Sequence, residues 1–350
     1  MHHRGLIFSL LLLPILLVVG LAGLRAADPH MGVEEIRPGM IGIGRTVFDG
    51  THVEEFKANI LGGLENVIGP HRNLILAKLE GGPLGHTGVI AGMSGSPVYV
   101  DGRLIGAVSY SLGTFSKEPI AGITPIKEMI DSASFTDVRP PGARVRMEFP
   151  LTPENLAAAF RKAFNWNRPF AAGSQDARLS GVSPVSGIGG GELGTLLRPI
   201  ATPLVMSGFE PGLGDLLGSA LGAQGFVPTG GSAAGSRAGE MPFKGPLKAG
   251  DAVGVMLVNG DLRLGGTGTV THVDGDRVYA FGHQFYNLGP TEFPMTRSYV
   301  YTVLPSLFSS SKLASTGEVI GTFLQDRATA IAGTLGPGPK MIPITLALES

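Results

Sequence analysis

Residues 97–108 read Pro-Val-Tyr-Val-Asp-Gly-Arg-Leu-Ile-Gly-Ala-Val, with an Asp-Gly pair between two apolar runs. A type I′ turn needs positive φ at both central residues, which Asp and Gly tolerate, so the stretch predicts a β-hairpin. The same pattern recurs at Asp49-Gly50, Asn259-Gly260 and Asp274-Gly275. Four turns of this kind predict a mainly β protein.

The turns divide the chain into two β-rich blocks, residues 31–140 and 246–350. Between them, residues 141–245 predict a helical and Gly/Ser/Pro-rich connection. Its expected parts are a helix from Thr152 to about Trp166, a short helix over Leu213–Leu221 and a flexible linker over Thr229–Gly239. Alternation over Met341–Leu348 predicts a final strand.

The N-terminus has the pattern of an export signal. His2, His3 and Arg4 precede an almost wholly apolar run over Leu6–Leu24, and the small residues Ala26 and Ala27 follow. This pattern predicts a signal peptide over residues 1–26, with an uncleaved membrane anchor as the alternative. The protein is therefore expected outside the cytoplasm, as a secreted, periplasmic or membrane-anchored protein.

Composition excludes several classes of function. The 350 residues contain no cysteine, which excludes disulfides, thiolate metal sites and cysteine nucleophiles. Lys and Arg number 27 against 28 Asp and Glu, and this balance gives no basic surface for nucleic acid. No metal-ligand spacing is recognisable, so neither a metal nor another cofactor is expected.

The stretch Gly92-Met93-Ser94-Gly95-Ser96-Pro97 directly precedes the hairpin at residues 97–108. Glycines on both sides of Ser94 allow the tight turn on which a serine nucleophile needs to sit. The N–H groups of Gly92 and Ser94 would then form the oxyanion hole. Two alternatives stay open, an ordinary Gly/Ser/Pro loop and Ser96 as the nucleophile. The α/β-hydrolase motif G-x-S-x-G is not met, because position 96 is Ser.

The motif is similar to the serine motif of chymotrypsin-like proteases, and longer stretches resemble the sporulation stage IV B serine peptidase family. The matching stretches lie in both blocks, at residues 50–56, 87–97, 102–108, 266–271, 280–283 and 317–321. The resemblance implies a chymotrypsin-like double β-barrel and a serine endopeptidase that cleaves a protein or peptide. Founding members of the family act outside the cytoplasmic membrane in proteolytic signalling.

The resemblance also implies site residues. Ser94 matches the nucleophile, His283 the general base and, with a one-residue gap, Glu80 the position of the acid, where the family has Asp. The family has its histidine before its serine, whereas this chain has the reverse order. It also usually carries a PDZ module, which is not recognisable here. Because a catalytic triad is defined by geometry, the reversed order does not exclude catalysis.

Other residues and other functions compete with these assignments. His86, eight residues before Ser94, is the second candidate for the base, and Asp274 and Asp276 are further candidates for the acid. The rival function is a non-catalytic secreted β-barrel that binds peptide or envelope components. A structural envelope protein with a Gly-rich spacer is a weaker third reading.

Overall fold

The computed structural model describes residues 28–112, 116–135, 150, 152, 154–155, 158–159, 197–222, 224–230, 243, 245–345 and 347. The signal predicted for residues 1–26 lies outside the described residues. So do most of the helix predicted from Thr152 to Trp166 and most of the linker predicted over residues 229–239. Within the described ranges, no helix has the length and apolar character needed to cross a bilayer.

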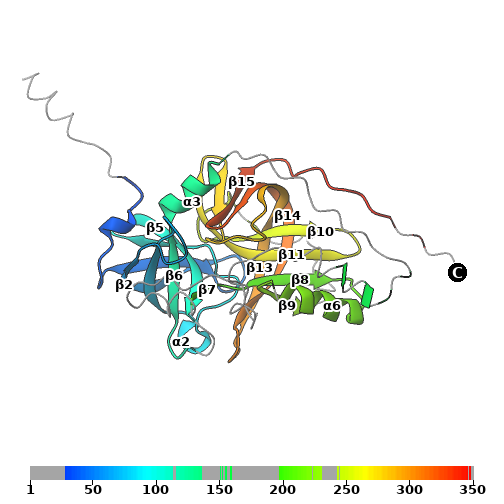
Figure 1. Cartoon of the computed structure of the whole chain (residues 1–350), viewed down its shortest axis with the longest axis horizontal. Helices are drawn as coiled ribbons and strands as arrows, with labels where there is room; N and C mark the ends of the chain where they lie inside the picture. Colours follow the sequence, from blue (N-terminus) through cyan, green and yellow to red (C-terminus); the bar gives the residue numbers. More distant parts are fainter. Residues whose placement is uncertain are drawn as a thin grey trace, which may run out of the picture.

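The first β-rich block forms a closed barrel of six strands, seen in blue to cyan in Figure 1. The sheet order is β4-β1-β2-β3-β6-β5, and the pairing of β4 with β5 closes it. A 3₁₀ turn (Val33–Glu35) precedes it, and the short helix α2 (Leu84–Thr87) leads into the serine motif. The strands are β1 (Ile41–Val47), β2 (Val53–Leu64), β3 (Leu74–Glu80), β4 (Ser96–Val100), β5 (Arg103–Leu112) and β6 (Ile120–Pro125).

The second block forms another closed barrel of six strands, in yellow to red in Figure 1. Its order is β10-β13-β14-β15-β12-β11, closed by the pairing of β10 with β11. The double β-barrel expected from the sequence is therefore present. The strands are β10 (Ala252–Val258), β11 (Arg263–Asp274), β12 (Arg277–Ala280), β13 (Gly289–Leu304), β14 (Ser311–Arg327) and β15 (Ala330–Leu335).

All four hairpins predicted from Asp-Gly and Asn-Gly turns are present. They join β1 to β2, β4 to β5, β10 to β11 and β11 to β12. Asp101 has φ 50° and Gly102 has φ 78°, the left-handed backbone that a type I′ turn requires. The Asn259-Gly260 and Asp274-Gly275 hairpins share one strand, because β11 runs from Arg263 to Asp274.

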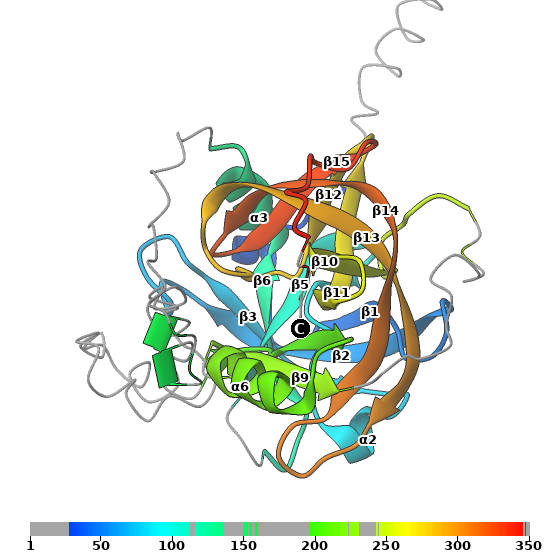
Figure 2. The same cartoon turned by 90° about the vertical axis from the view of Figure 1, so that its right-hand side faces the viewer.

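The segment predicted as a helical connection also supplies strands. It contains β7 (Leu197–Pro199), β8 (Thr202–Ser207), α6 (Pro211–Gly222) and β9 (Phe226–Gly230). β7 pairs with β5 of the first barrel, whereas β8 pairs with β11 of the second and, in parallel, with β9. α6 contains the predicted short helix and lies beside β9 (Figure 2). Thr152 caps the other predicted helix, since its Oγ1 accepts from the N–H of Asn155 at 3.2 Å.

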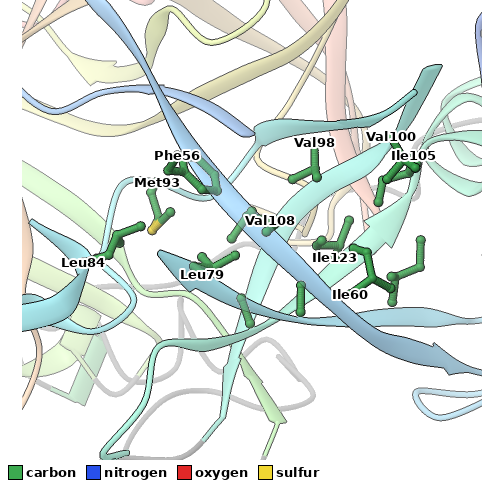
Figure 3. Packing of buried hydrophobic residues seen from close by; sticks show 14 of the residues in the cluster. Phe56, Ile60, Leu79, Leu84, Met93, Val98, Val100, Ile105, Val108 and Ile123 are labelled. Atoms are coloured by element: carbon green, nitrogen blue, oxygen red, sulfur yellow. The ribbon is translucent and has the colours of Figure 1, made fainter. Parts of the chain in front are cut away.

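Each barrel has its own apolar core. Figure 3 shows the first core, in which Phe56, Leu79 and Val108 come from different strands. Two smaller clusters join the barrels. In one of them, α3 (Ile126–Ala133) buries Ile126 and Met129 beside Tyr279 of the second barrel. This packing joins the barrels beside the serine and histidine segments.

The strand predicted over Met341–Leu348 is wrong for the described part of that range. Residues 341–345 have no strand pairing, and the side chains of Ile342 and Ile344 are exposed. The physical reason is that β15, the preceding strand, already pairs with both β12 and β14. Both edges of β15 are therefore occupied, so the chain that follows it finds no free edge there.

Candidate active site

The serine loop, residues 91–95, enters β4 and is anchored by its methionine. Met93 is fully buried in the first core near Phe56 and Leu84 (Figure 3). Gly92 and Gly95 have φ of 92° and 95°, so both take a backbone that L residues rarely adopt. A Cβ on Gly95 would lie 2.0 Å from the carbonyl oxygen of Thr269. Glycine is therefore required immediately after Ser94.

The second barrel holds the carbonyl groups of the serine loop. Thr269 of β11 donates its N–H to the Ser94 oxygen at 2.9 Å and its Oγ1–H to the Gly92 oxygen at 3.2 Å. Thr271 Oγ1 donates to the Gly95 oxygen at 2.7 Å. The loop of the first barrel thus takes its conformation from a strand of the second.

Some backbone N–H groups of the serine loop donate hydrogen bonds and others do not. The N–H of Met93 donates to Ile90, and that of Gly95 donates to Val108. Among the described residues, the N–H groups of Gly92 and Ser94 have no acceptor. These two amides are the pair that the sequence predicted as the oxyanion hole, and their role there stays a prediction.

Ser94 itself is fully buried, and its Oγ has no hydrogen-bond partner within the described ranges. Leaving a buried hydroxyl unsatisfied costs about 1–3 kcal/mol. A hydroxyl kept at this cost is typical of a residue retained for chemistry rather than for stability. Pro203 of β8 lies against the loop, since a Cβ on Gly92 would be 2.9 Å from its Cγ.

His283 follows β12 on a strained backbone. Phe281 and Gly282 both have φ of 68°, and a non-glycine residue at positive φ is uncommon and costly. The His283 ring is buried, and its Nδ1 lies 2.7 Å from the carbonyl oxygen of Gln284. Because a carbonyl only accepts, Nδ1 carries the proton in this contact, and Nε2 is the basic nitrogen.

The serine and histidine segments meet at the interface of the barrels. Thr269, which donates its N–H to Ser94, accepts the N–H of Phe281 at 3.2 Å. Gly282 packs against β5, because a Cβ there would be 2.8 Å from Cβ of Ser109. Its carbonyl oxygen accepts from Thr124 Oγ1 at 2.8 Å. The reversed order of the two blocks therefore still brings the two segments side by side, although Ser94 Oγ is not hydrogen-bonded to the His283 ring.

Glu80 lies at the exposed end of β3. Its carboxylate is 3.8 Å from Nζ of Lys57, and its side chain is 48% exposed. These features are those of a surface ion pair, and they do not support the predicted role of Glu80 as the acid behind a buried imidazole. Whether it completes a triad stays a prediction.

The alternative candidates have other positions. His86, Asp274 and Asp276 are exposed, the last two in the turn between β11 and β12. Ser96 is buried, and its Oγ donates to the Met93 oxygen at 2.5 Å. That bond gives Ser96 a structural role in the loop.

Two buried charged residues that the sequence did not predict, Lys312 and Asp326, lie beside this site. Among the described residues, the buried side chains of the Asp, Glu, Lys, Arg and His types are His283, Lys312 and Asp326. The Asp326 carboxylate accepts hydrogen bonds from three backbone N–H groups, those of Phe285 and Tyr286 at 2.7 Å each and that of Leu288 at 3.3 Å. It therefore orders the loop that follows His283. No local pattern marks either residue, because their burial depends on the barrels closing.

Two closed barrels with a serine loop and a histidine segment at their interface define a chymotrypsin-like serine peptidase architecture. Residues 29–129 match the family model of the SpoIVB peptidase, family S55. This match confirms the resemblance to the sporulation stage IV B peptidases over the serine-bearing barrel and supports a serine-type peptidase. No curated protein and no solved structure gives a significant match. In the described part of the chain, no three His, Asp or Glu side chains are grouped as metal ligands.

Proposed function

We propose that this protein is an exported serine endopeptidase in which Ser94 is the nucleophile and His283 the general base. The observation that carries the proposal is the meeting of the two segments through Thr269, within a barrel pair whose first half matches a serine peptidase family. The protonated Nδ1 of His283 supports the assignment of Nε2 as the base.

In the proposed reaction, Ser94 Oγ attacks the carbonyl carbon of a peptide bond while its proton passes to Nε2 of His283. The N–H groups of Gly92 and Ser94 stabilise the resulting oxyanion. Collapse of the intermediate breaks the C–N bond, and the imidazolium gives its proton to the leaving amine. Water then hydrolyses the acyl-enzyme by the same route, which regenerates the hydroxyl.

Without a triad acid, this reaction can still run, but at a reduced rate. The Gln284 carbonyl already selects the required imidazole tautomer, and Asp326 fixes the loop behind it. Replacing an orienting carboxylate with a neutral group slows a serine protease by about 10⁴ yet leaves measurable catalysis. A slow, selective peptidase is consistent with the proteolytic signalling that the family resemblance implies.

Fluorophosphonate labelling followed by peptide mapping tests the nucleophile, and a peptide library read by mass spectrometry tests the activity. The wild type should be labelled at Ser94 and cleave peptides, and Ser94→Ala should abolish both. Ser96→Ala is the matched control and should keep the label. Loss of the label in Ser96→Ala together with retention in Ser94→Ala would transfer the role to Ser96.

The rival function is a non-catalytic barrel that binds peptides, and the burial of both Ser94 and His283 favours it. The same experiment decides between the two. Peptide binding without labelling or cleavage by the wild type would establish the rival. The proposed export is tested by N-terminal sequencing of the secreted protein, which should begin close to residue 27.

A further inference from the structure

Lys312 is a buried amine beside the serine loop. It is the second residue of β14, and its backbone N–H donates to the Ala91 oxygen at 3.0 Å. Its aliphatic stem packs on Gly92, since a Cβ there would be 3.3 Å from Lys312 Cδ. Only 2% of the residue is exposed. Both its main chain and its side chain therefore contact the loop that carries Ser94.

Two threonine hydroxyls connect the amine to the loop. Nζ of Lys312 donates to Thr46 Oγ1 at 2.8 Å, and Thr46 Oγ1 lies 3.4 Å from Thr269 Oγ1. Thr269 Oγ1 in turn donates to the Gly92 oxygen at 3.2 Å. An ammonium group can only donate, so it directs the Thr46 proton towards Thr269 and the Thr269 proton towards Gly92. A neutral amine can also accept from Thr46, which permits the opposite direction.

A charged amine at this position is costly. Burial lowers the pKa of Lys312 to about 7, and no charged side chain contributes to this change in the part of the chain that the structure describes. Its neighbours in β1, β11 and the serine loop, namely Thr46, Thr269 and Gly92, are neutral. An apolar residue would avoid this cost, so a lysine retained here is a candidate for function.

We propose that Lys312 is a positioning residue for the peptidase reaction, acting through Thr46 and Thr269 to hold the Gly92 carbonyl and so the oxyanion-hole conformation of the serine loop. This inference rests on the proposed function. The ammonium fixes the direction of the hydroxyl chain, which keeps the Gly92 carbonyl turned towards Thr269. The Gly92 N–H shares its peptide plane with the Ala91 carbonyl, which the Lys312 N–H holds at 3.0 Å, so the two contacts of Lys312 fix the peptides on both sides of Gly92.

The proposal gives the activity a bell-shaped dependence on pH. On the acid side, activity falls because His283 must be unprotonated to accept the Ser94 proton. On the alkaline side, activity falls because Lys312 loses its proton and the hydroxyl chain is no longer fixed in direction. The alkaline fall is the signature of Lys312, since His283 gives none.

The test measures kcat, KM and the pH profile of peptide cleavage for three variants in the full chain. Lys312→Met should lower kcat about tenfold, leave KM within about twofold and remove the alkaline fall. Thr46→Val keeps the amine but breaks the hydroxyl chain, so it should also lower kcat and remove the alkaline fall. Thr267→Val is the matched control, because this buried hydroxyl on β11 has no partner among the described residues. It should leave kcat and the profile unchanged.

The outcomes separate this inference from the proposed function. The role of Lys312 alone is overturned if the wild type cleaves peptides, Ser94→Ala does not, and Lys312→Met has the kcat and pH profile of the wild type. Cleavage that survives Ser94→Ala, or no cleavage by the wild type, overturns both. If Lys312→Met does not fold, Thr46→Val decides, and a variant that keeps the wild-type kcat and alkaline fall refutes the proposal.

Discussion

Replacing Lys312 with methionine should stabilise the protein at neutral pH, and the gain should shrink as the pH rises. Burial lowers the pKa of this lysine from 10.5 to about 7. Between these values the unfolded chain holds a proton that the folded chain has released, so wild-type stability rises with pH across this range. Below both values the full cost applies, and the difference between them corresponds to about 5 kcal/mol. Methionine has a similar length and carries no charge.

The net gain is smaller than this cost. Thr46 loses its hydrogen-bond donor in the variant, which removes about 1 kcal/mol. Lys312→Met should therefore exceed the wild type by about 3–4 kcal/mol at pH values of about 6–7. From about pH 7 to about pH 9 the stability advantage of Lys312→Met should shrink by about 2 kcal/mol, because the folded wild type loses the Lys312 proton over this range while the unfolded chain keeps it.

Urea unfolding followed by far-UV circular dichroism at several pH values measures both quantities. Lys117→Met is the control, because it makes the same substitution at an exposed lysine. A Lys312→Met variant with the same stability difference from wild type at every pH would refute the reasoning, since it would mean that the folded and unfolded chains release this proton together.

Three further substitutions test the site. Gly95→Ala places a Cβ 2.0 Å from the Thr269 oxygen on a backbone at φ 95°, so it should destabilise the fold by about 3 kcal/mol or more in a thermal melt and abolish labelling of the serine. Asp326→Asn weakens the three bonds that order the loop after His283 and should lower kcat about tenfold with a loss of about 1–3 kcal/mol in urea unfolding; unchanged kcat would contradict its positioning role. Glu80→Gln removes an exposed ion pair and should change kcat less than about twofold; a loss of about 10⁴ would instead establish Glu80 as the triad acid.

The sequence predicted the hairpins because their signals are local. An Asp-Gly or Asn-Gly turn depends on its own backbone, and all four predicted hairpins formed, although only Asp101-Gly102 has positive φ at both residues. The serine loop was equally recognisable, because its glycines and its following strand are neighbours in the chain. Local turn chemistry therefore predicted the β class, whereas the double barrel and the role of Ser94 were implied by the family resemblance, and the role of Ser94 stays a prediction.

What the sequence did not reveal depends on contacts between distant segments. Lys312 follows three serines and resembles a surface residue, yet closure of the barrels buries it against Thr46, 266 residues away. Asp326 precedes an arginine in the chain but is buried against the loop after His283. The strands β7, β8 and β9 were missed for a related reason, since β7 pairs with β5 and β8 pairs with β11, which are distant in the chain.

The order of the two barrels along the chain also sets when the serine could act. Synthesis proceeds from the N-terminus, so the barrel with Ser94 emerges first. The groups that hold its loop, Thr269, Thr271 and Lys312, all belong to the barrel that emerges last. In the proposed mechanism, a chain still being made has the hydroxyl without the imidazole or the groups that hold its loop, so peptide cleavage would begin only when the final strands have closed.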